Sequence, residues 1–589
     1  MSPPVPSPTR DQRPSVRLNQ GTYIGTVLAE PEYPRAVEAF LGVSYAKCER
    51  LRRAVPLGAS GDTFDASDYG PVCPTADPSF PSDEHCLNAN VFRPVTAGGN
   101  KGVPDATAES KKVPVLVYFH GGAFNFGRGG DRNLAAFVAF AKRDLVAVSF
   151  NYRLGPLGFL PCGLAATEGV ANIGLLDQRA LLQWVQRNIS AFGGDEKDVT
   201  VMGFSAGAHS HPYASQLGHH LLSPSSRALF YRAILESGAP TARSVLSSTH
   251  PRHEAQFAQF LRHASVSSYS PAQVLPALRA LPLRTLLQAS LATWTECAPS
   301  VQWPFQPSVD GDGDEDSVIP SPPIKTWTSP SLPPPPPLIT GFNTSEGTMF
   351  VPATASSPTA LADFFSALIP ALTPQDLELL ESLYPPASTY PPPPTPAHGS
   401  QFRRLAQAYG HYGYIAPLLH SAHFASLSGA PVWVYEYAAH ADLAAANHGD
   451  HVPAATHDTD ILSAHKTPGL LAVSDAMHGY WSSFAATADG PNTLPNASGI
   501  TWPRFVSPFG DDDAGDSVPD PEDRDETRGK ILVFGEGNDE LMGRKGERRR
   551  GTVARVRALT GLEVRQFRFW WDRVGLSEGM GVAADGTKL

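Results

Sequence analysis

Short runs of apolar residues recur along the chain and alternate with longer segments of helical periodicity. Seven of these runs are rich in β-branched and aromatic residues: Val113–Phe119, Leu145–Asn151, Val199–Met202, Ala233–Leu235, Leu338–Thr340, Val432–Tyr437 and Ile531–Phe534. Continuous apolar runs are typical of strands that are covered on both faces, as in a mostly parallel sheet.

The segment Gly174–Ile189 has the pattern of an amphipathic helix. Its apolar side comprises Leu175, Leu181, Leu182, Trp184 and Val185. Asp177 lies near its start, where a negative charge is favourable. Because helical segments of this kind alternate with the apolar runs, the pattern predicts an α/β layered fold.

Several stretches interrupt the alternation. Residues 1–16 are proline-rich and predict a flexible tail. Pro320–Pro337 and Pro385–Pro396 predict extended surface loops of polyproline type. Asp511–Glu526 is acidic and predicts a solvated insertion. The remaining chain, 17–589, is predicted to be a single large α/β domain that carries these insertions.

Composition narrows the functional classes. The chain has 589 residues, of which 42% are hydrophobic, so it can bury a large core. Its 46 basic and 57 acidic residues give a net charge of −11, which argues against a nucleic-acid partner. Five cysteines without a CxxC pair favour neither a disulfide scaffold nor a structural zinc site. No apolar run is long enough to predict a transmembrane helix.

The clearest chemical motif follows the strand Val199–Met202. The sequence Gly203-Phe204-Ser205-Ala206-Gly207 is G-x-S-x-G, the pattern of a sharp strand-to-helix turn that exposes a nucleophilic serine. Glycine is needed beside such a turn because the backbone leaves no room for a side chain. The motif makes Ser205 a candidate nucleophile, although G-x-S-x-G alone also arises by chance.

A second motif, His120-Gly121-Gly122-Ala123-Phe124, directly follows the strand Val113–Phe119. By itself it could be a plain Gly-Gly turn. Together with Ser205 it has the chain order in which α/β hydrolases supply backbone N–H groups to an oxyanion hole.

Further segments resemble motifs of a known family. They are Phe40–Ala46, Phe64–Pro74, Glu84–Val91, Asn151–Leu160, Asn172–Arg179 and Phe192–Asp195. From about Asn19 to Trp571 the chain resembles a type-B carboxylesterase, in the cholinesterase-like branch of the α/β-hydrolase fold, and most of all its fungal members. The resemblance implies a large, mostly parallel sheet flanked by helices, with helical insertions that form a gorge or lid, and no metal or cofactor.

The resemblance also implies a catalytic triad. Ser205 matches the family nucleophile, and Glu346, in the segment Gly341–Gly347, matches the family acid. His457, in the segment Ala455–Leu462, fits the family histidine best. Four other histidines lie close by in the sequence and remain alternatives: His448, His451, His465 and His478. Of these, His448 stands out within Asn447-His448-Gly449-Asp450.

Other site residues follow from the same resemblance. The backbone N–H groups of Gly121, Gly122 and Ala206 match the oxyanion hole, and Ser237 matches a family serine near the triad. Cys73 and Cys86 match the first family disulfide. The loop between these cysteines contains no tryptophan, which argues against a choline substrate.

The sequence therefore predicts a serine ester hydrolase that acts on a small or medium organic ester or lactone. An acyltransferase or a lactone-forming enzyme with the same triad is an alternative, and a non-catalytic adhesion or scaffold protein is another. The N-terminus lacks the apolar segment of a secretory signal, which favours a cytoplasmic location. The cysteine pair and the sequons at Asn188, Asn343 and Asn496 favour secretion instead.

Overall fold

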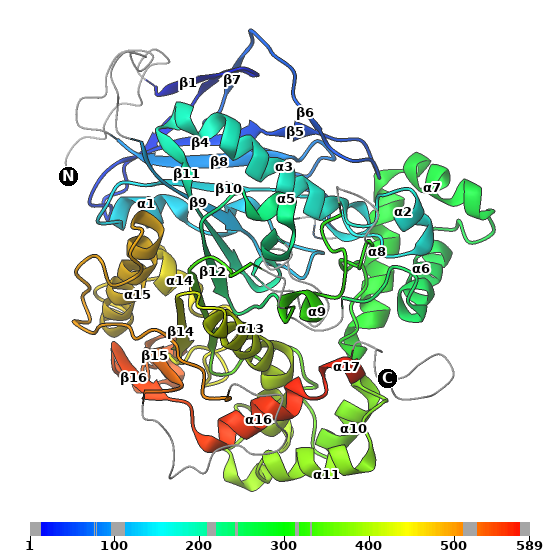
Figure 1. Ribbon diagram of the computed structural model, residues 1–589, viewed down its shortest axis with the longest axis vertical. Coiled ribbons are helices and arrows are strands. Elements are labelled where there is room, and N and C mark those ends of the chain that lie inside the picture. Colours follow the sequence, from blue (N-terminus) through cyan, green and yellow to red (C-terminus); the bar gives the residue numbers. More distant parts are fainter. Residues whose placement is uncertain are drawn as a thin grey trace.

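The computed structural model describes residues 13–75, 77, 79–95, 112–208, 220–241, 245–311, 317–329, 333–510 and 527–577. A mixed sheet of eleven strands forms the centre, in the order β16-β15-β14-β13-β12-β11-β9-β10-β8-β4-β3. Figure 1 shows these strands in the middle of the molecule with helices around them. Two further small sheets are described, β1-β2-β7 and β5-β6.

All seven predicted strands are confirmed, and they are parallel neighbours. These are β9 (Val113–Phe119), β10 (Val146–Phe150), β11 (Gly194–Phe204), β12 (Arg232–Glu236), β13 (Leu338–Asn343), β14 (Val432–Tyr437) and β15 (Lys530–Phe534). Antiparallel strands extend the sheet at both edges: β3 (Thr26–Leu28), β4 (Val37–Ser44), β8 (Asn88–Pro94) and β16 (Ala554–Ala558). The small sheets are built from β1 (Ser15–Leu18), β2 (Gly21–Ile24), β5 (Ala46–Lys47), β6 (Val55–Pro56) and β7 (Thr63–Asp65).

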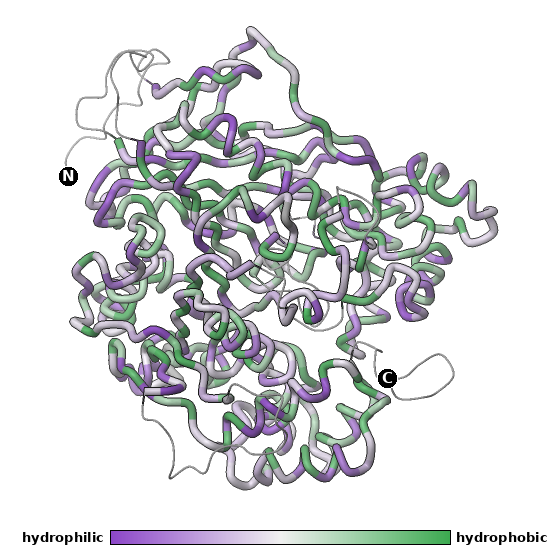
Figure 2. The backbone as a smooth tube through the Cα atoms, in the orientation of Figure 1, coloured by the Kyte–Doolittle hydropathy of each residue, from purple (hydrophilic) through white to green (hydrophobic). Residues whose placement is uncertain are grey.

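Both faces of the sheet are buried, which explains the continuous apolar runs. In β9, Val115 and Val117 belong to one hydrophobic cluster, whereas the alternate residues Leu116 and Tyr118 belong to a second. Because successive side chains of a strand point to opposite faces, the two clusters lie on opposite sides of the sheet. Figure 2 shows long hydrophobic stretches along the central strands.

Helix α3 (Ile173–Asn188) covers the first face, and α1 (Leu134–Phe140) and α15 (Pro468–Ala486) cover the second. The predicted apolar side of α3 is buried as expected. The carboxylate of Asp177 is also buried, and it forms an ion pair with Arg153 at 2.6 Å.

The other described α-helices occur along the chain between Gly163 and Ser577. They are α2 (Gly163–Thr167), α5 (Pro224–Arg227), α6 (Pro251–His263), α7 (Pro271–Ala280), α8 (Leu283–Cys297), α9 (Pro323–Trp327), α10 (Ala360–Leu368), α11 (Pro374–Leu383), α12 (Phe402–Gly410), α13 (Ala416–Leu427), α14 (Val452–Thr456), α16 (Gly561–Trp571) and α17 (Val574–Ser577). A π-helical turn, His411–Ile415, joins α12 to α13. No described helix is both long and apolar enough to cross a bilayer.

The proline-rich segments have mixed outcomes. Residues 385–396 contain one short 3-10 turn, Ala387–Thr389, and otherwise lack regular structure, as expected. The segment 320–337, of which 330–332 lie outside the described residues, contains helix α9, so the loop prediction is wrong there. Residues 1–12 of the predicted tail and the acidic segment 511–526 also lie outside the described residues.

Candidate active site

Ser205 lies at the tip of a tight turn at the end of β11. Its backbone φ is +53°, a conformation that is rare for a residue with a side chain. A Cβ on Gly203 would lie 2.3 Å from the carbonyl oxygen of Gly207, and one on Gly207 would lie 2.1 Å from that of Phe119. Both flanking glycines are therefore required by the close approach of the backbone, and the turn projects the serine from the strand end.

Glu346 follows the next strand but one, β13, and its side chain is fully buried. One carboxylate oxygen accepts the backbone N–H of Asn343 at 2.7 Å. The other lies 2.5 Å from Nδ1 of His448. The carboxyl ends of neighbouring parallel strands meet at one edge of the sheet, so the loops after β11 and β13 lie on the same edge.

His448 joins these two loops, because its Nε2 lies 2.7 Å from the Ser205 hydroxyl. It belongs to the loop between β14 and α14. Asn447 anchors that loop to the glutamate loop: its carbonyl accepts from the Asn343 side chain at 2.6 Å, and its side-chain oxygen accepts from Thr348 at 2.8 Å. Ser205, His448 and Glu346 thus form one hydrogen-bonded chain.

The expectation that His457 faces Ser205 is wrong in this structure. His457 is the C-cap of α14, and its Nε2 lies 2.9 Å from Asp475 of α15. Its ring stacks on Phe140 of α1 with centroids 3.8 Å apart. Helix α14 separates His457 from the loop that carries His448. The ring of His457 therefore packs against the helices α1 and α15 instead of the ends of the strands.

The other candidate histidines have other surroundings, although one of them lies close to the serine turn. His451 is fully buried beside Phe204, His478 lies 3.0 Å from the carbonyl of Phe137, and His465 is exposed. One local feature of the sequence is consistent with a special position for His448, the glycine that follows it. Gly449 has φ +93°, and a Cβ there would come within 3.0 Å of the Phe204 ring, so the residue after His448 has to be small.

The loop after β9 brings Gly121 against the serine turn. A Cβ on Gly121 would lie 2.9 Å from the carbonyl oxygen of Phe204 and 3.1 Å from Cβ of Ser205. Gly122 has φ +106°, and His120, which precedes the two glycines, is buried and stacks on Tyr152 at 4.2 Å. Burial lowers the pKa of His120 to about 4, so its ring is neutral.

Ala206 and Ser237 lie next to this loop arrangement. Ala206 is fully buried directly after Ser205. Ser237 follows β12 and repeats the geometry of Ser205 with φ +51°, but it is fully buried. Its backbone N–H donates to Gly341 at 2.8 Å, and its hydroxyl has no hydrogen-bond partner among the described residues.

Aromatic side chains surround His448. The rings of Phe204, Tyr414 and Phe350 lie 5.0, 4.7 and 5.5 Å from its ring. Tyr414 comes from the π-helical turn, a feature that is frequent at functional sites.

We call the segment His120–Phe124 the glycine loop. Four half-buried rings lie in a row between the end of this loop and His448, and we call them the aromatic row. It comprises Phe126, Trp294, Trp303 and Phe350, with successive centroids 5.0, 5.0 and 5.7 Å apart. Met349, beside the end of the row in sequence, is 65% exposed. Apolar side chains are therefore concentrated on this side of His448.

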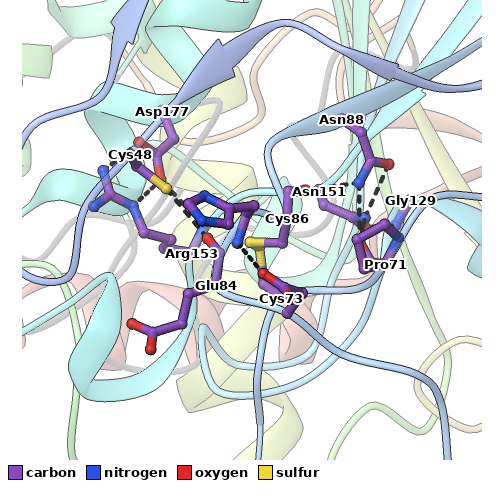
Figure 3. Close-up of a disulfide and its surroundings, with 12 residues drawn as sticks. Cys48, Pro71, Cys73, Glu84, Cys86, Asn88, Gly129, Asn151, Arg153 and Asp177 are labelled. Carbon is purple, nitrogen blue, oxygen red and sulfur yellow. Dashed lines mark hydrogen bonds and ion pairs between the residues drawn. A yellow bond between two sulfur atoms is a disulfide. The ribbon is translucent and has the colours of Figure 1, made fainter. Parts of the chain in front are cut away.

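The predicted disulfide between Cys73 and Cys86 is confirmed. Figure 3 shows it beside Asn88 and Asn151, whose side-chain amides both donate to the carbonyl of Pro71. The side-chain oxygen of Asn151 also accepts the backbone N–H of Gly129 at 2.8 Å. Through Asn151 the disulfide loop is thus tied to the segment that follows the glycine loop.

The described residues contain no group of three or more histidine, cysteine or acidic side chains that could hold a metal ion. The chemistry that the arrangement can support is that of its side chains: a serine hydroxyl, a histidine that can accept its proton, and a buried carboxylate that orients the histidine.

The fold and the comparisons with known proteins define the class: the protein is a carboxylic ester hydrolase with the α/β-hydrolase fold. Residues 12–513 match the model of the carboxylesterase family, and the chain belongs to that family.

Two curated relatives illustrate the relationship. The chain is 32% identical over 508 residues to secreted lipase 4 of Gibberella zeae, a match that covers 84% of this chain and 86% of that protein. It is 29% identical over 495 residues to para-nitrobenzyl esterase of Bacillus subtilis, which covers 80% and 89% of the two chains.

Solved structures show the same fold. EstA of Aspergillus niger superposes with a TM-score of 0.75 at 24% identity, over 97% of this chain and all of that one. A PNB esterase superposes with a TM-score of 0.64 at 27% identity, over 83% of this chain and 93% of the other.

Proposed function

We propose that the protein hydrolyses carboxylic esters through an acyl-enzyme formed on Ser205, with His448 as general base and Glu346 as the orienting acid. The observation that carries this proposal is the continuous hydrogen-bonded chain from the Ser205 hydroxyl through both ring nitrogens of His448 to the Glu346 carboxylate. This assignment replaces His457 by His448 in the triad expected from the sequence.

The proposed reaction has two halves. The Ser205 hydroxyl oxygen attacks the ester carbonyl while Nε2 of His448 accepts its proton, and Glu346 stabilises the imidazolium through Nδ1. The tetrahedral intermediate collapses, and His448 returns the proton to the departing alcohol. Water then attacks the acyl-enzyme, again with His448 as base, and releases the acid and free Ser205.

The backbone N–H groups of Gly121, Gly122 and Ala206 are the proposed donors to the oxyanion. Support comes from the contact of Gly121 with the serine turn and from the place of Ala206 directly after Ser205. Loss of one such donor typically costs ~10²–10³-fold in rate. Ser237 is proposed to support the turn from the neighbouring strand without contacting the substrate.

The aromatic row supports a small or medium organic ester with a bulky apolar or aryl group as the substrate. Half-buried rings offer apolar area and stacking faces to such a group, and aromatic pairs gain ~0.5–1.5 kcal/mol beyond the area they bury. The names of two relatives, a secreted lipase and para-nitrobenzyl esterase, are compatible with this substrate class.

Export is the location that we now propose in place of the cytoplasm. The Cys73–Cys86 disulfide is typical of an oxidising compartment. Two relatives, from Gibberella zeae and Botryotinia fuckeliana, are named secreted lipases.

A fluorophosphonate probe tests the nucleophile. The probe should label the folded protein on Ser205, as mapped by peptide mass spectrometry, and S205A should not be labelled. S237A is the matched control, because it removes a serine of the same backbone geometry and should retain labelling. Absence of labelling in folded wild-type protein would overturn the proposal.

An ester panel tests the reaction itself. Turnover of aryl and alkyl esters should release the free acid, and added alcohols should divert only part of the acyl group. Complete transfer to alcohol would favour the acyltransferase alternative, and no turnover of any ester would favour the non-catalytic one.

A further inference from the structure

A fully buried carboxylate, Glu236, lies directly beside the serine turn. It ends β12, and in the register of β11 and β12 it is paired with Phe204, the residue before Ser205. Both oxygens of Glu236 accept hydrogen bonds from the guanidinium of Arg132, and one also accepts from Nε1 of Trp481 at 2.8 Å. Neither Arg132 nor Glu236 has any side-chain exposure.

Arg132 extends this arrangement to two other parts of the site. It belongs to the short segment that follows the glycine loop, and its Nε donates to the Thr456 hydroxyl at 2.8 Å. Thr456 is the last residue of α14, the helix that begins directly after the loop of His448. The Arg132–Glu236 ion pair therefore connects three parts of the site. They are the segment after the glycine loop, the strand β12 beside the serine turn, and the helix α14 that follows the His448 loop.

His451 completes the cluster from the other end of α14. It is the N-cap of that helix, three residues after His448, and it is fully buried. Its Nε2 lies 3.8 Å from a carboxylate oxygen of Glu236. Its ring meets the ring of Phe204 edge-on, with centroids 5.5 Å apart. Both ends of α14 thus lie against the same carboxylate, one hydrogen-bonded through Arg132 and one in contact through His451 without a hydrogen bond.

Opposite charges hold Glu236 and Arg132 together. Burial opposes ionisation of Glu236, but Arg132 and His451 outweigh it and lower the pKa of the carboxyl to about 2. The guanidinium of Arg132 is likewise kept charged, because Glu236 overcomes its desolvation and raises its pKa. A buried pair of this kind is weak evidence for stability, but its directional bonds restrict the geometry of the groups it joins.

We propose that Glu236, through Arg132 and His451, is a positioning residue. It sets His448 at hydrogen-bonding distance from Ser205, and it fixes the glycine loop relative to these two residues. Glu236 touches neither the substrate nor the reacting atoms. This inference rests on the proposed function, since it concerns the geometry of the same triad. A displacement of about 1 Å in such a site can cost ~10²-fold in rate.

The double substitution R132M/E236Q tests the ion pair. It removes both charges together, so that neither is left buried alone, and the amide oxygen of the new side chain would still accept from Trp481. We expect kcat to fall about 10- to 100-fold with KM within threefold of wild type, because the substrate surfaces are unchanged and only the triad geometry relaxes.

A matched control is R153M/D177N. Arg153 and Asp177 form a second buried ion pair, at 2.6 Å. The guanidinium of Arg153 also donates to the backbone carbonyls of Glu49 and Arg52. This variant makes the same chemical change outside the His448 loop. It should change melting temperature by a similar amount and leave kcat within threefold of wild type.

A second variant keeps the test decisive if the double substitution does not fold. H451F retains a ring against Phe204 but removes the contact with Glu236, and we expect kcat to fall about 3- to 10-fold with KM unchanged. H253F is its control, because His253 is a buried histidine of α6 that bonds the Ser247 carbonyl. A kcat for H451F equal to that of H253F would overturn the inference.

The outcomes separate this inference from the proposed function. If wild-type protein neither reacts with fluorophosphonate nor turns over esters, the proposed function fails. If wild type is active and the folded R132M/E236Q and H451F variants match their controls in kcat, the positioning role alone is overturned. A loss expressed in KM, with kcat unchanged, would also overturn it.

Discussion

Two histidines nine residues apart, His448 and His457, differ in surroundings that bear on the proposed catalytic role of His448. Both lie between β14 and α15, and both place one ring nitrogen beside a carboxylate: Glu346 at 2.5 Å for His448 and Asp475 at 2.9 Å for His457. Judged by a histidine–acid pair alone, the two positions are equivalent.

The difference lies in burial of the acid and in what the second ring nitrogen meets. The side chain of Glu346 is fully buried, whereas that of Asp475 is 53% exposed. The second nitrogen of His448 meets the Ser205 hydroxyl, whereas that of His457 has no hydrogen-bond partner among the described residues. A carboxylate shielded from water can orient an imidazole firmly, and an exposed one is screened. The comparison therefore supports the proposal that His448 acts in catalysis and that His457 serves packing.

The largest expected effect is that of H448A. Removal of the general base should lower kcat about 10⁴-fold or more, while KM and melting temperature change little. Steady-state kinetics on an aryl ester, with loss of fluorophosphonate labelling as a second measurement, check this. Retention of more than a tenth of wild-type activity would reverse the assignment of the two histidines.

E346Q should have the next largest effect. The glutamine keeps the size of the side chain but removes the charge that stabilises the imidazolium, so kcat should fall about 10²- to 10⁴-fold. D475N removes the corresponding charge at His457 and should leave kcat within threefold. Equal losses in the two variants would erase the distinction between the two histidine–acid pairs.

The same contrast explains how far the sequence could predict the site. Ser205 and Glu346 each follow a strongly apolar strand, so local pattern and strand order are enough to place them at the sheet edge. The position of His448 depends on contacts between distant segments, notably those of Asn447 with Asn343 and Thr348. The local match to the family motif contains no information about these contacts, so it favoured His457 over the histidine that contacts Ser205.

The fold follows the same rule. Seven strands and the helix α3 could be predicted, because burial on both faces of a sheet, or on one side of a helix, leaves a periodic pattern. Helix α9 could not, because prolines fill the segment 320–337 and hide a helix that begins with Pro323 at its first position.

D450N should have a moderate effect, which is a gain in stability at alkaline pH instead of a change in kcat. Asp450 accepts from the backbone and side-chain N–H groups of Asn447 and so shapes the His448 loop. Burial raises the pKa of Asp450 to about 6, above its value near 4 in an unfolded chain. The stability that protonated Asp450 contributes is therefore complete below about pH 4 and is lost as pH rises through about 6.

An amide in its place does not ionise and can still accept both bonds. D450N should therefore gain up to about 2–3 kcal/mol over wild type at pH 8 and little or nothing at pH 4. Thermal unfolding of both proteins from pH 4 to pH 8 measures this difference. A gain that is independent of pH would show that the effect comes from packing instead of ionisation.

The smallest effect on catalysis should come from H457A. The ring of His457 stacks on Phe140, so its loss should lower the melting temperature by only about one degree, since aromatic pairs of this kind contribute ~0.5–1.5 kcal/mol and the chain is long. Its contact with the half-exposed Asp475 adds little. Because neither contact reaches Ser205, kcat and KM should stay within threefold of wild type. H457F, which keeps a ring on Phe140, should recover most of the lost stability, and a kcat that falls in both variants to the level of H448A would return the catalytic role to His457.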